Sequence, residues 1–267
     1  MKKIVQRFRQ IRFSKRKEFV AITIILTLGL ISTQIVSADV RYWLLLALTF
    51  AALGGSAIGL RENLKGVKWF TLLLVPTMFT VSIGLFYFLL PVRWLTRLPT
   101  ALFYGIGMYA ILLVENIYNI ATERSIQLLR VAHAVGFLAT LASYFFLLNT
   151  ILSFRLTSYV NSLLSGIIVF PLIIQALWAV ELKDRIDSRV VLYSFFFSLI
   201  VGQLSFSMSF WPVKPIMGSL FITTITYSLI GVGQHYFAKR LFRNTILDYV
   251  KVLVVVSILV LLTTQYQ

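Results

Sequence analysis

The sequence predicts an all-α integral membrane protein with about nine transmembrane helices, a cytoplasmic N-terminus and an external C-terminus. Three observations support this class. Of the 267 residues, 59% are hydrophobic and 13% are charged, whereas a soluble domain has about 45–50% apolar and about 25% charged residues. The apolar residues form runs of about 17–25, enough to cross about 30 Å of hydrocarbon. Lys and Arg concentrate in alternate connections between these runs, as the positive-inside rule requires.

The expected helices are joined by short connections, which predicts a single polytopic transmembrane domain over residues 18–264. With the N-terminus inside, 20 of the 25 Lys and Arg residues lie on the cytoplasmic side and five on the outer side. Eight or ten spans would break this alternation. The expected helices cover residues 18–37, 41–60, 68–90, 99–120, 129–153, 157–180, 190–210, 215–236 and 248–264.

Residues 1–17 form a basic arm that precedes the first expected helix. Ile4, Phe8 and Ile11 recur at helical spacing among Lys and Arg residues, which predicts an amphipathic helix on the inner leaflet. Anionic lipid is the expected partner of this arm, at roughly 1 kcal/mol per nearby cationic side chain. The favoured interpretation of the arm is a topology determinant that keeps the N-terminus inside. Docking to a protein or to nucleic acid is the weaker alternative, so nucleic acid is not an expected partner.

The first apolar run has a second interpretation, as a signal peptide. The letters "VSA" at Val36–Ala38 resemble a cleavage site, which would remove the residues up to Ala38. The run is about 18 residues long, however, and exceeds the usual apolar region of roughly 7–15. We therefore expect an uncleaved membrane anchor.

Cysteine and histidine usage narrows the chemistry. The chain has no cysteine, which excludes disulfides, thiolate metal sites and cysteine nucleophiles. It has two histidines, His133 and His235, too few for a histidine-rich metal site. We expect no metal and no cofactor.

One acidic residue, Glu115, lies inside the fourth expected helix, in the stretch "ILLVENIYNI". It lies about five residues from the cytoplasmic end, or roughly 8 Å deep. His133 lies at the same depth in the next helix, so the two side chains are expected to meet in an antiparallel hairpin. An ionisable residue at this depth is a functional hypothesis by default, and a hydrogen bond that fixes the helix pair is the structural alternative.

Further polar residues are expected on the same side of the membrane as Glu115. Together they define either a cytoplasmic vestibule or scattered helix contacts, because the sequence does not show which helices are neighbours. The candidate polar cluster is Glu115, Asn116, Asn119, His133, Gln175, Gln234 and His235.

The outer connections are basic. Arginine can hold a phosphate group through two hydrogen bonds, so this rim predicts contacts with lipid headgroups. Plain anchoring at the membrane interface is the alternative, and we favour it. The candidate headgroup contacts are Arg41, Arg93, Arg97 and Arg155, and Lys214 lies on the same rim.

Two short motifs suggest an enzyme. "LGGSAIGL", with Ser56, and "VAHAVGF", with His133, resemble the serine and histidine motifs of rhomboid intramembrane proteases. The resemblance implies a Ser56–His133 dyad. Ala57 replaces the expected glycine, and the two helices run in opposite directions here, whereas the rhomboid helices are parallel. A hydrolase or transferase is therefore the least favoured hypothesis.

The segment Phe86–Ala121, "FYFLLPVRWLTRLPTALFYGIGMYAILLVENIYNIA", resembles uncharacterised bacterial polytopic membrane proteins. That resemblance implies a bacterial inner membrane and supplies no activity. The favoured function is binding or transport of a small molecule, ion or lipid, with Glu115 as a proton or cation carrier. The alternative is a scaffold subunit of a membrane or envelope complex.

Overall fold

A computed structural model describes residues 15–91, 93–121 and 128–264. Over these residues the chain forms nine long helices, and each coincides with an expected apolar run, so the all-α class is confirmed. The helices are α2 (Lys15–Thr33), α3 (Ala38–Leu60), α4 (Lys68–Leu89), α5 (Trp94–Ala121), α6 (Leu129–Ser153), α7 (Ser158–Glu181), α8 (Ser188–Met208), α9 (Pro215–Phe237) and α10 (Arg243–Thr263). The predicted arm, residues 1–17, lies mostly outside the described residues.

Eight of these helices, α3 to α10, are long and apolar enough to cross a membrane. The ninth, α2, has 19 residues, which is about 28 Å at 1.5 Å per residue. Its first turn holds Lys15, Arg16, Lys17 and Glu18, and with these charges α2 is not among the helices that are apolar enough over the length of a span. A multi-pass membrane protein therefore fits the structure, with eight candidate spans among the described residues where nine were predicted.

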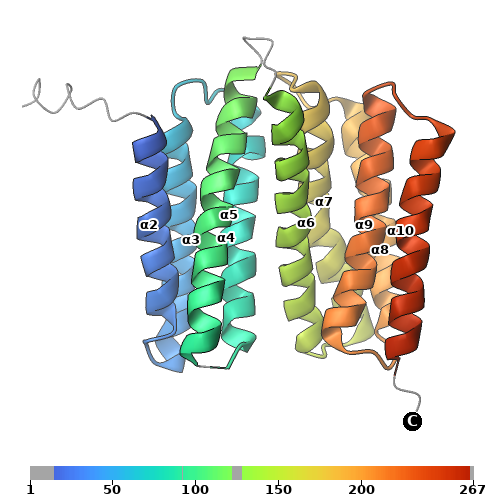
Figure 1. Cartoon of the computed structure of the whole chain (residues 1–267), viewed down its shortest axis with the longest axis horizontal. Helices are drawn as coiled ribbons and strands as arrows, with labels where there is room; N and C mark the ends of the chain where they lie inside the picture. Colours follow the sequence, from blue (N-terminus) through green and yellow to red (C-terminus); the bar gives the residue numbers. More distant parts are fainter. Residues whose placement is uncertain (1–14, 92, 122–127, 265–267) are drawn as a thin grey trace, which may run out of the picture.

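The helices are arranged in two layers, as Figure 1 shows. One layer contains α2, α5, α6, α9 and α10, and the other contains α3, α4, α7 and α8. Successive helices run in opposite directions, so α2 begins and α10 ends at opposite ends of the bundle (Figure 1). This antiparallel order follows from the short connections, because a short connection can only join neighbouring helices.

Two four-helix groups with the same arrangement make up most of the bundle. In the first, α2 contacts α3, α3 contacts α4, α4 contacts α5, and α5 returns to α2; α6, α7, α8 and α9 repeat this ring. The starts of α3 and α7 (residues 38 and 158) lie 120 residues apart, as do those of α4 and α8 (68 and 188). Because each group has an even number of antiparallel helices, the second group begins at the same end of the bundle as the first (Figure 1). The last helix, α10, packs against α9.

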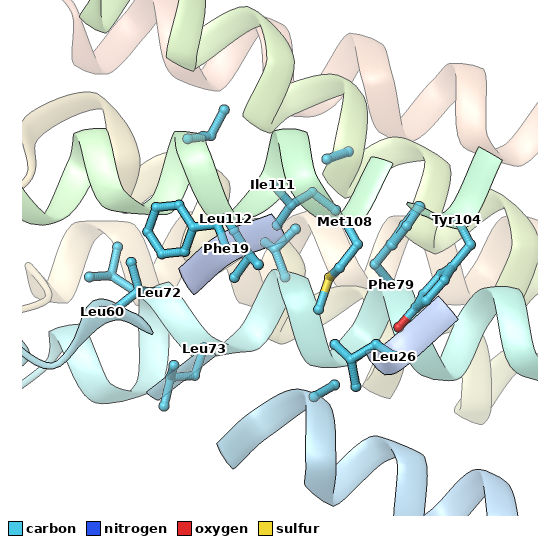
Figure 2. Packing of buried hydrophobic residues seen from close by; sticks show 14 of the residues in the cluster. Phe19, Leu26, Leu60, Leu72, Leu73, Phe79, Tyr104, Met108, Ile111 and Leu112 are labelled. Carbon is cyan, nitrogen blue, oxygen red and sulfur yellow. The ribbon is translucent and has the colours of Figure 1, made fainter. Parts of the chain in front are cut away.

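Two apolar cores lie mainly within one group each, and both extend across the boundary between the groups. The first core includes Phe19, Leu26, Leu72 and Met108, and Figure 2 shows these side chains packed between the helices. The rings of Phe79 and Tyr104 stack with centroids 5.7 Å apart. The second core lies mainly among α6 to α10. The groups meet where α6 contacts α4 and α5, and where α7 contacts α4.

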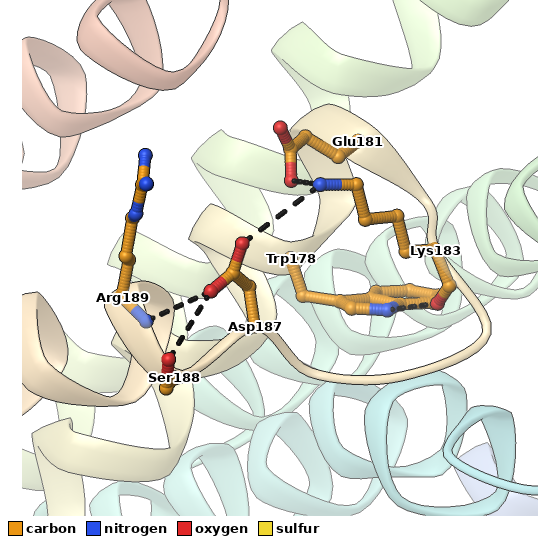
Figure 3. Close-up of polar contacts among 6 residues, drawn as sticks. All are labelled: Trp178, Glu181, Lys183, Asp187, Ser188 and Arg189. Atoms are coloured by element: carbon orange, nitrogen blue, oxygen red, sulfur yellow. Dashed lines mark hydrogen bonds and ion pairs between the residues drawn. The ribbon is translucent and has the colours of Figure 1, made fainter.

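The connection between α7 and α8 is held by polar contacts (Figure 3). The Trp178 indole N–H donates to the Lys183 carbonyl oxygen at 2.8 Å. The Lys183 Nζ lies 2.8 Å from Glu181 and 3.9 Å from Asp187. Asp187 accepts the Arg189 backbone N–H at 3.0 Å and so caps α8. These contacts determine where α7 ends and α8 begins.

Candidate functional site

The site surrounds Glu115, which the sequence identified as the exceptional acid. Its side chain is 0% exposed on α5. Gln175 of α7 donates its Nε2–H to Glu115 Oε1 at 3.4 Å. The other carboxyl oxygen, Oε2, has no hydrogen-bond partner among the described residues. A carboxyl group buried with half of its acceptors unused is costly unless it carries a proton or a cation.

A second contact extends this network to α6. Thr140 donates its hydroxyl to Gln175 Oε1 at 3.4 Å and to the Gly136 carbonyl oxygen at 2.9 Å. Thr140 and Gln175 are 1% and 2% exposed. Both 3.4 Å contacts are longer than the usual 2.7–3.2 Å of protein hydrogen bonds. The carboxyl group is therefore loosely held, and another group can replace either contact at low cost.

One turn further along α5, Asn119 is also fully buried. It donates Nδ2–H to the Leu60 carbonyl oxygen of α3 at 2.8 Å, and its backbone oxygen accepts from Lys68 Nζ at 3.1 Å. Its Oδ1 has no partner among the described residues, and neither does the Oγ of Ser56. These atoms add two unused oxygens to that of Glu115.

The three unused oxygens lie at neighbouring levels of the bundle. Ser56 and Leu60 are four residues apart on α3, as Glu115 and Asn119 are on α5, so each pair shares a helix face. The two helices contact each other and run in the same direction. Because Asn119 bonds to Leu60, one turn back places Ser56 at the level of Glu115.

The expected contact between Glu115 and His133 is not found in the described residues. His133 Nε2 instead lies 2.8 Å from the Ala179 carbonyl oxygen of α7, and its ring lies 5.5 Å from that of Tyr118. The predicted contact between Glu115 and His133 was wrong because α7 packs against α6 and α4 and lies close enough to bond to both residues. α7 supplies Gln175 to Glu115 and the Ala179 carbonyl oxygen to His133. The sequence alone did not show that α7 is a neighbour of both helices.

The remaining members of the polar cluster are separate from Glu115. Asn116 accepts from Lys15 Nζ at 3.5 Å, beside an ion pair of 2.6 Å between Lys15 and Glu62. Gln234 donates to the Ala176 carbonyl oxygen at 3.0 Å. The ring of His235 lies 6.1 Å from that of Tyr249. Among the described contacts of these seven residues, one hydrogen bond joins two of them, Gln175 and Glu115. The others make separate local contacts.

The four candidate headgroup arginines differ in their surroundings. Arg97 donates Nε–H to Gln34 Oε1 at 2.9 Å and lies 5.4 Å from the ring of Trp94. Arg41 lies 5.4 Å from the ring of Phe88. The side chains of Arg97 and Arg41 thus contact other side chains of the bundle. Arg93 and Arg155 are exposed.

The dyad implied by the rhomboid resemblance is not formed within the described residues. His133 Nε2 bonds to a backbone carbonyl, and Ser56 Oγ has no partner. A serine dyad needs hydrogen-bond reach between nucleophile and base.

Sequence reasoning did not assign three polar residues to the surroundings of Glu115 and Asn119, although it named Ser56 for another role. Lys68, Ser56 and Thr140 are 6%, 0% and 1% exposed. Lys68 begins the expected helix 68–90 and was counted among the cytoplasmic charges; as the first residue of α4 it reaches the Asn119 backbone oxygen. Ser56 was singled out by the rhomboid resemblance alone, and Thr140 carries no distinguishing sequence signal, because threonine and serine occur throughout these helices.

One of three comparisons with known proteins found a match. A family model described as a protein of unknown function, DUF5656, matches residues 20–263, from the first turns of α2 to the last residue of α10. No curated protein and no solved structure matches the chain.

Proposed function

Because the chain belongs to the DUF5656 family of proteins of unknown function, we propose its function from the surroundings of Glu115. The chain binds and moves a small ion or molecule across a membrane, with Glu115 carrying a proton or a cation. The single observation behind this proposal is the fully buried carboxyl group with an unused Oε2. Residues that serve only as structural links normally have their buried acceptors satisfied.

The chemistry of the surroundings supports a hard cation or a proton. The unused atoms are oxygens of a carboxylate, an amide and a hydroxyl, from Glu115, Asn119 and Ser56. Oxygen ligands of this kind suit hard cations. Intramembrane acids of transporters commonly form proton relays. Gln175 and Thr140 are uncharged, so they can turn toward the carboxyl group or away from it without an uncompensated charge.

The position of Glu115 supports a role in crossing the membrane. α5 contacts α6, and α7 supplies Gln175, so the site lies where the two four-helix groups meet. Substrate sites of many transporters lie between structural repeats. The proposed location is a bacterial inner membrane with the N-terminus in the cytoplasm, which the distribution of Lys and Arg supports.

The experiment measures cation binding and flux in parallel. Purified protein in detergent is heated in NaCl and in choline chloride at equal ionic strength, and proteoliposomes are tested for ²²Na⁺ uptake and for proton uptake with an internal pH dye. We expect Na⁺ to raise the unfolding temperature, or protons to enter under an imposed potential, since a ligand that binds the native state stabilises it. Glu115→Gln abolishes either effect.

Glu181→Gln is the matched control, because Glu181 has a partly exposed side chain and pairs with Lys183. It removes the same charge away from the site and keeps the parent's response. A parent protein that shows neither Na⁺ stabilisation nor cation flux contradicts the proposal. So does a Glu115→Gln protein that keeps the parent's response.

A scaffold role is the second candidate, and α10 favours it. Of the described residues of α10, one, Val260, is buried, so most of this apolar helix faces outward. Such a face fits either lipid or another membrane protein. Purification in mild detergent distinguishes the two: a scaffold retains a partner at fixed stoichiometry, and a chain that purifies alone does not support this role.

A further inference from the structure

A cavity of about 350 Å³ lies at the end of the bundle opposite the start of α2. The turn between α6 and α7 and the turn between α8 and α9 form it. It is lined by Arg155, Asn161, Ser209, Trp211 and Lys214, with apolar residues around them. Its volume is at the lower end of the range of about 300–1,000 Å³ for small-molecule sites.

Two cations, Arg155 and Lys214, line this cavity, and both are exposed. The side chains of Arg155 and Lys214 make no hydrogen bond or ion pair within the described residues. No Asp or Glu lines the cavity. Within the described residues, Arg155 and Lys214 therefore place two positive charges at the cavity with no acidic side chain in its lining, which favours a bound anion.

A buried polar group completes the lining. Asn161 is 4% exposed, and its Nδ2 donates to the Leu156 carbonyl oxygen at 3.2 Å and to Ser209 Oγ at 3.1 Å. Its Oδ1 has no partner among the described residues. Both donor positions are used, so the free capacity of Asn161 is for a hydrogen-bond donor.

The first four-helix group provides an internal comparison. Its corresponding turns, α2–α3 and α4–α5, lie at the same end of the bundle (Figure 1). There Gln34 donates to the Tyr87 carbonyl oxygen at 2.7 Å, and Arg97 donates to Gln34 at 2.9 Å. Arg97 of the first group thus ties its own turns together, whereas Arg155 and Lys214 of the second group line a cavity.

We infer that the cavity between the α6–α7 and α8–α9 turns binds a phosphate ester. Arg155 and Lys214 hold the phosphate oxygens, and Asn161 Oδ1 accepts a hydroxyl or ammonium donor from the alcohol part of the ester. Arginine and lysine are the usual cationic phosphate ligands in proteins. A glycerophospholipid headgroup and a soluble phosphate ester share this chemistry. The inference does not depend on Glu115 carrying a cation.

Two probes separate the sources. Protein in mixed micelles is titrated with a short-chain phosphatidylglycerol, and in parallel with glycerol 3-phosphate, and binding is measured by native mass spectrometry and isothermal titration. Binding of phosphatidylglycerol without competition from millimolar glycerol 3-phosphate indicates a lipid headgroup. Binding of glycerol 3-phosphate itself indicates a soluble ligand. Diacylglycerol, which lacks the phosphate, is expected not to compete.

The test variants are Arg155→Asn and Lys214→Gln, singly and together. Arg155 has a left-handed backbone, with φ of 50°, a conformation that Asn tolerates well, so this change removes the charge and keeps the turn. Loss of one charge-assisted contact is expected to weaken binding about tenfold. The double variant is expected to bind the phosphate ester about a hundredfold more weakly than the parent.

The double variant Lys65→Gln, Arg243→Gln is the matched control. Both residues are exposed and lie outside the cavity, so the control removes the same net charge elsewhere. We expect it to bind like the parent. The inference is overturned if neither probe binds the parent protein, or if the cavity variants bind as the parent does. An equal loss in the control also overturns it, because binding would then reflect net charge.

Discussion

Glu115 differs from the acidic side chains that form ion pairs. Glu62 lies 2.6 Å from Lys15 with 63% of its side chain exposed, and Asp248 lies 3.0 Å from Lys251 with 72% exposed. Pairs of this kind contribute about 0–1 kcal/mol and are screened by water. Glu115 instead contacts an amide in a fully buried position. Its presence is therefore not explained by an ion pair.

Replacement of Glu115 by Gln tests whether this acid stabilises the fold. Because its one hydrogen bond is long and Oε2 is unused, we expect the unfolding free energy to stay the same or to rise by about 1 kcal/mol, since a neutral isostere avoids burial of an ionisable group. Thermal unfolding at pH 7 beside the parent measures this. A loss of about 3–5 kcal/mol would identify a structural pair and contradict the carrier proposal.

Asp187 provides a pH-dependent prediction outside the membrane spans. The Arg189 backbone N–H lowers the pKa of Asp187 below its ordinary value of 3.8, and the nearby charge of Lys183 acts in the same direction. A carboxylate with a lowered pKa stabilises the native state above its unfolded pKa, and this contribution is lost as the pH falls through the folded pKa. We therefore expect Asp187→Asn to lower the unfolding temperature at pH 7.

The difference between Asp187→Asn and the parent is expected to shrink as the pH falls below the ordinary pKa of 3.8 and through the lowered pKa of Asp187, because the parent's carboxylate is then protonated too. Asn can still cap α8, so the variant isolates the charge. A difference that stays constant across this range would show that the charge of Asp187 does not stabilise the protein.

Among the helices, α7 and α8 approach each other most closely at two glycines. A Cβ on Gly202 would lie 3.2 Å from the Ser162 carbonyl oxygen, and one on Gly166 would lie 3.3 Å from that of Ser198. Ser162 also donates its hydroxyl to the Gly202 carbonyl oxygen at 2.8 Å. Small residues and short polar contacts of this kind join transmembrane helices.

Replacement of Gly202 by Leu is expected to lower stability by about 1–3 kcal/mol, because the backbone of α7 must move to admit the side chain. Gly54→Ala in α3 is the control: nothing lies within 4 Å of its added Cβ. That change should be neutral, or stabilising by up to about 1 kcal/mol through helix propensity. Thermal unfolding of both variants measures the effects, and equal stability would show that the α7–α8 contact is not tight.

For the molecule as a whole, the direction of each helix determines at which end of the bundle each site lies. The Glu115 site lies near the end where α5 terminates, and the cavity at Arg155 lies at the opposite end (Figure 1). If α3 to α10 all cross the membrane, these two sites face different compartments. A cation or proton and a phosphate ester would then be bound from opposite sides.

Cysteine labelling tests this orientation directly, because the chain has no cysteine of its own. Arg185 and Thr157 are exposed at opposite ends of α7. With a membrane-impermeant maleimide on intact cells, we expect Thr157→Cys to react and Arg185→Cys to react only after lysis. The reverse result contradicts a cytoplasmic N-terminus, and labelling of both in intact cells contradicts a crossing by α7.

The nine helices and their order were determined by the sequence itself. α6 begins and ends at the predicted residues 129 and 153, and the others differ by a few residues because helix ends depend on turn contacts such as the cap at Asp187. Hydropathy and charge are properties of a window of about 20 residues, so no tertiary contact is needed to read them. Glu115 was recognisable for the same reason.

Its partner was decided by the tertiary structure. Gln175 lies 60 residues from Glu115 along the chain, and His133 turned to Ala179 instead. The structure alone also showed that the four-helix ring is repeated and that Arg155 and Lys214 line the same cavity. Which side chains meet depends on the rotation of each helix and on the choice of its neighbours, and both result from packing between segments that are distant in sequence.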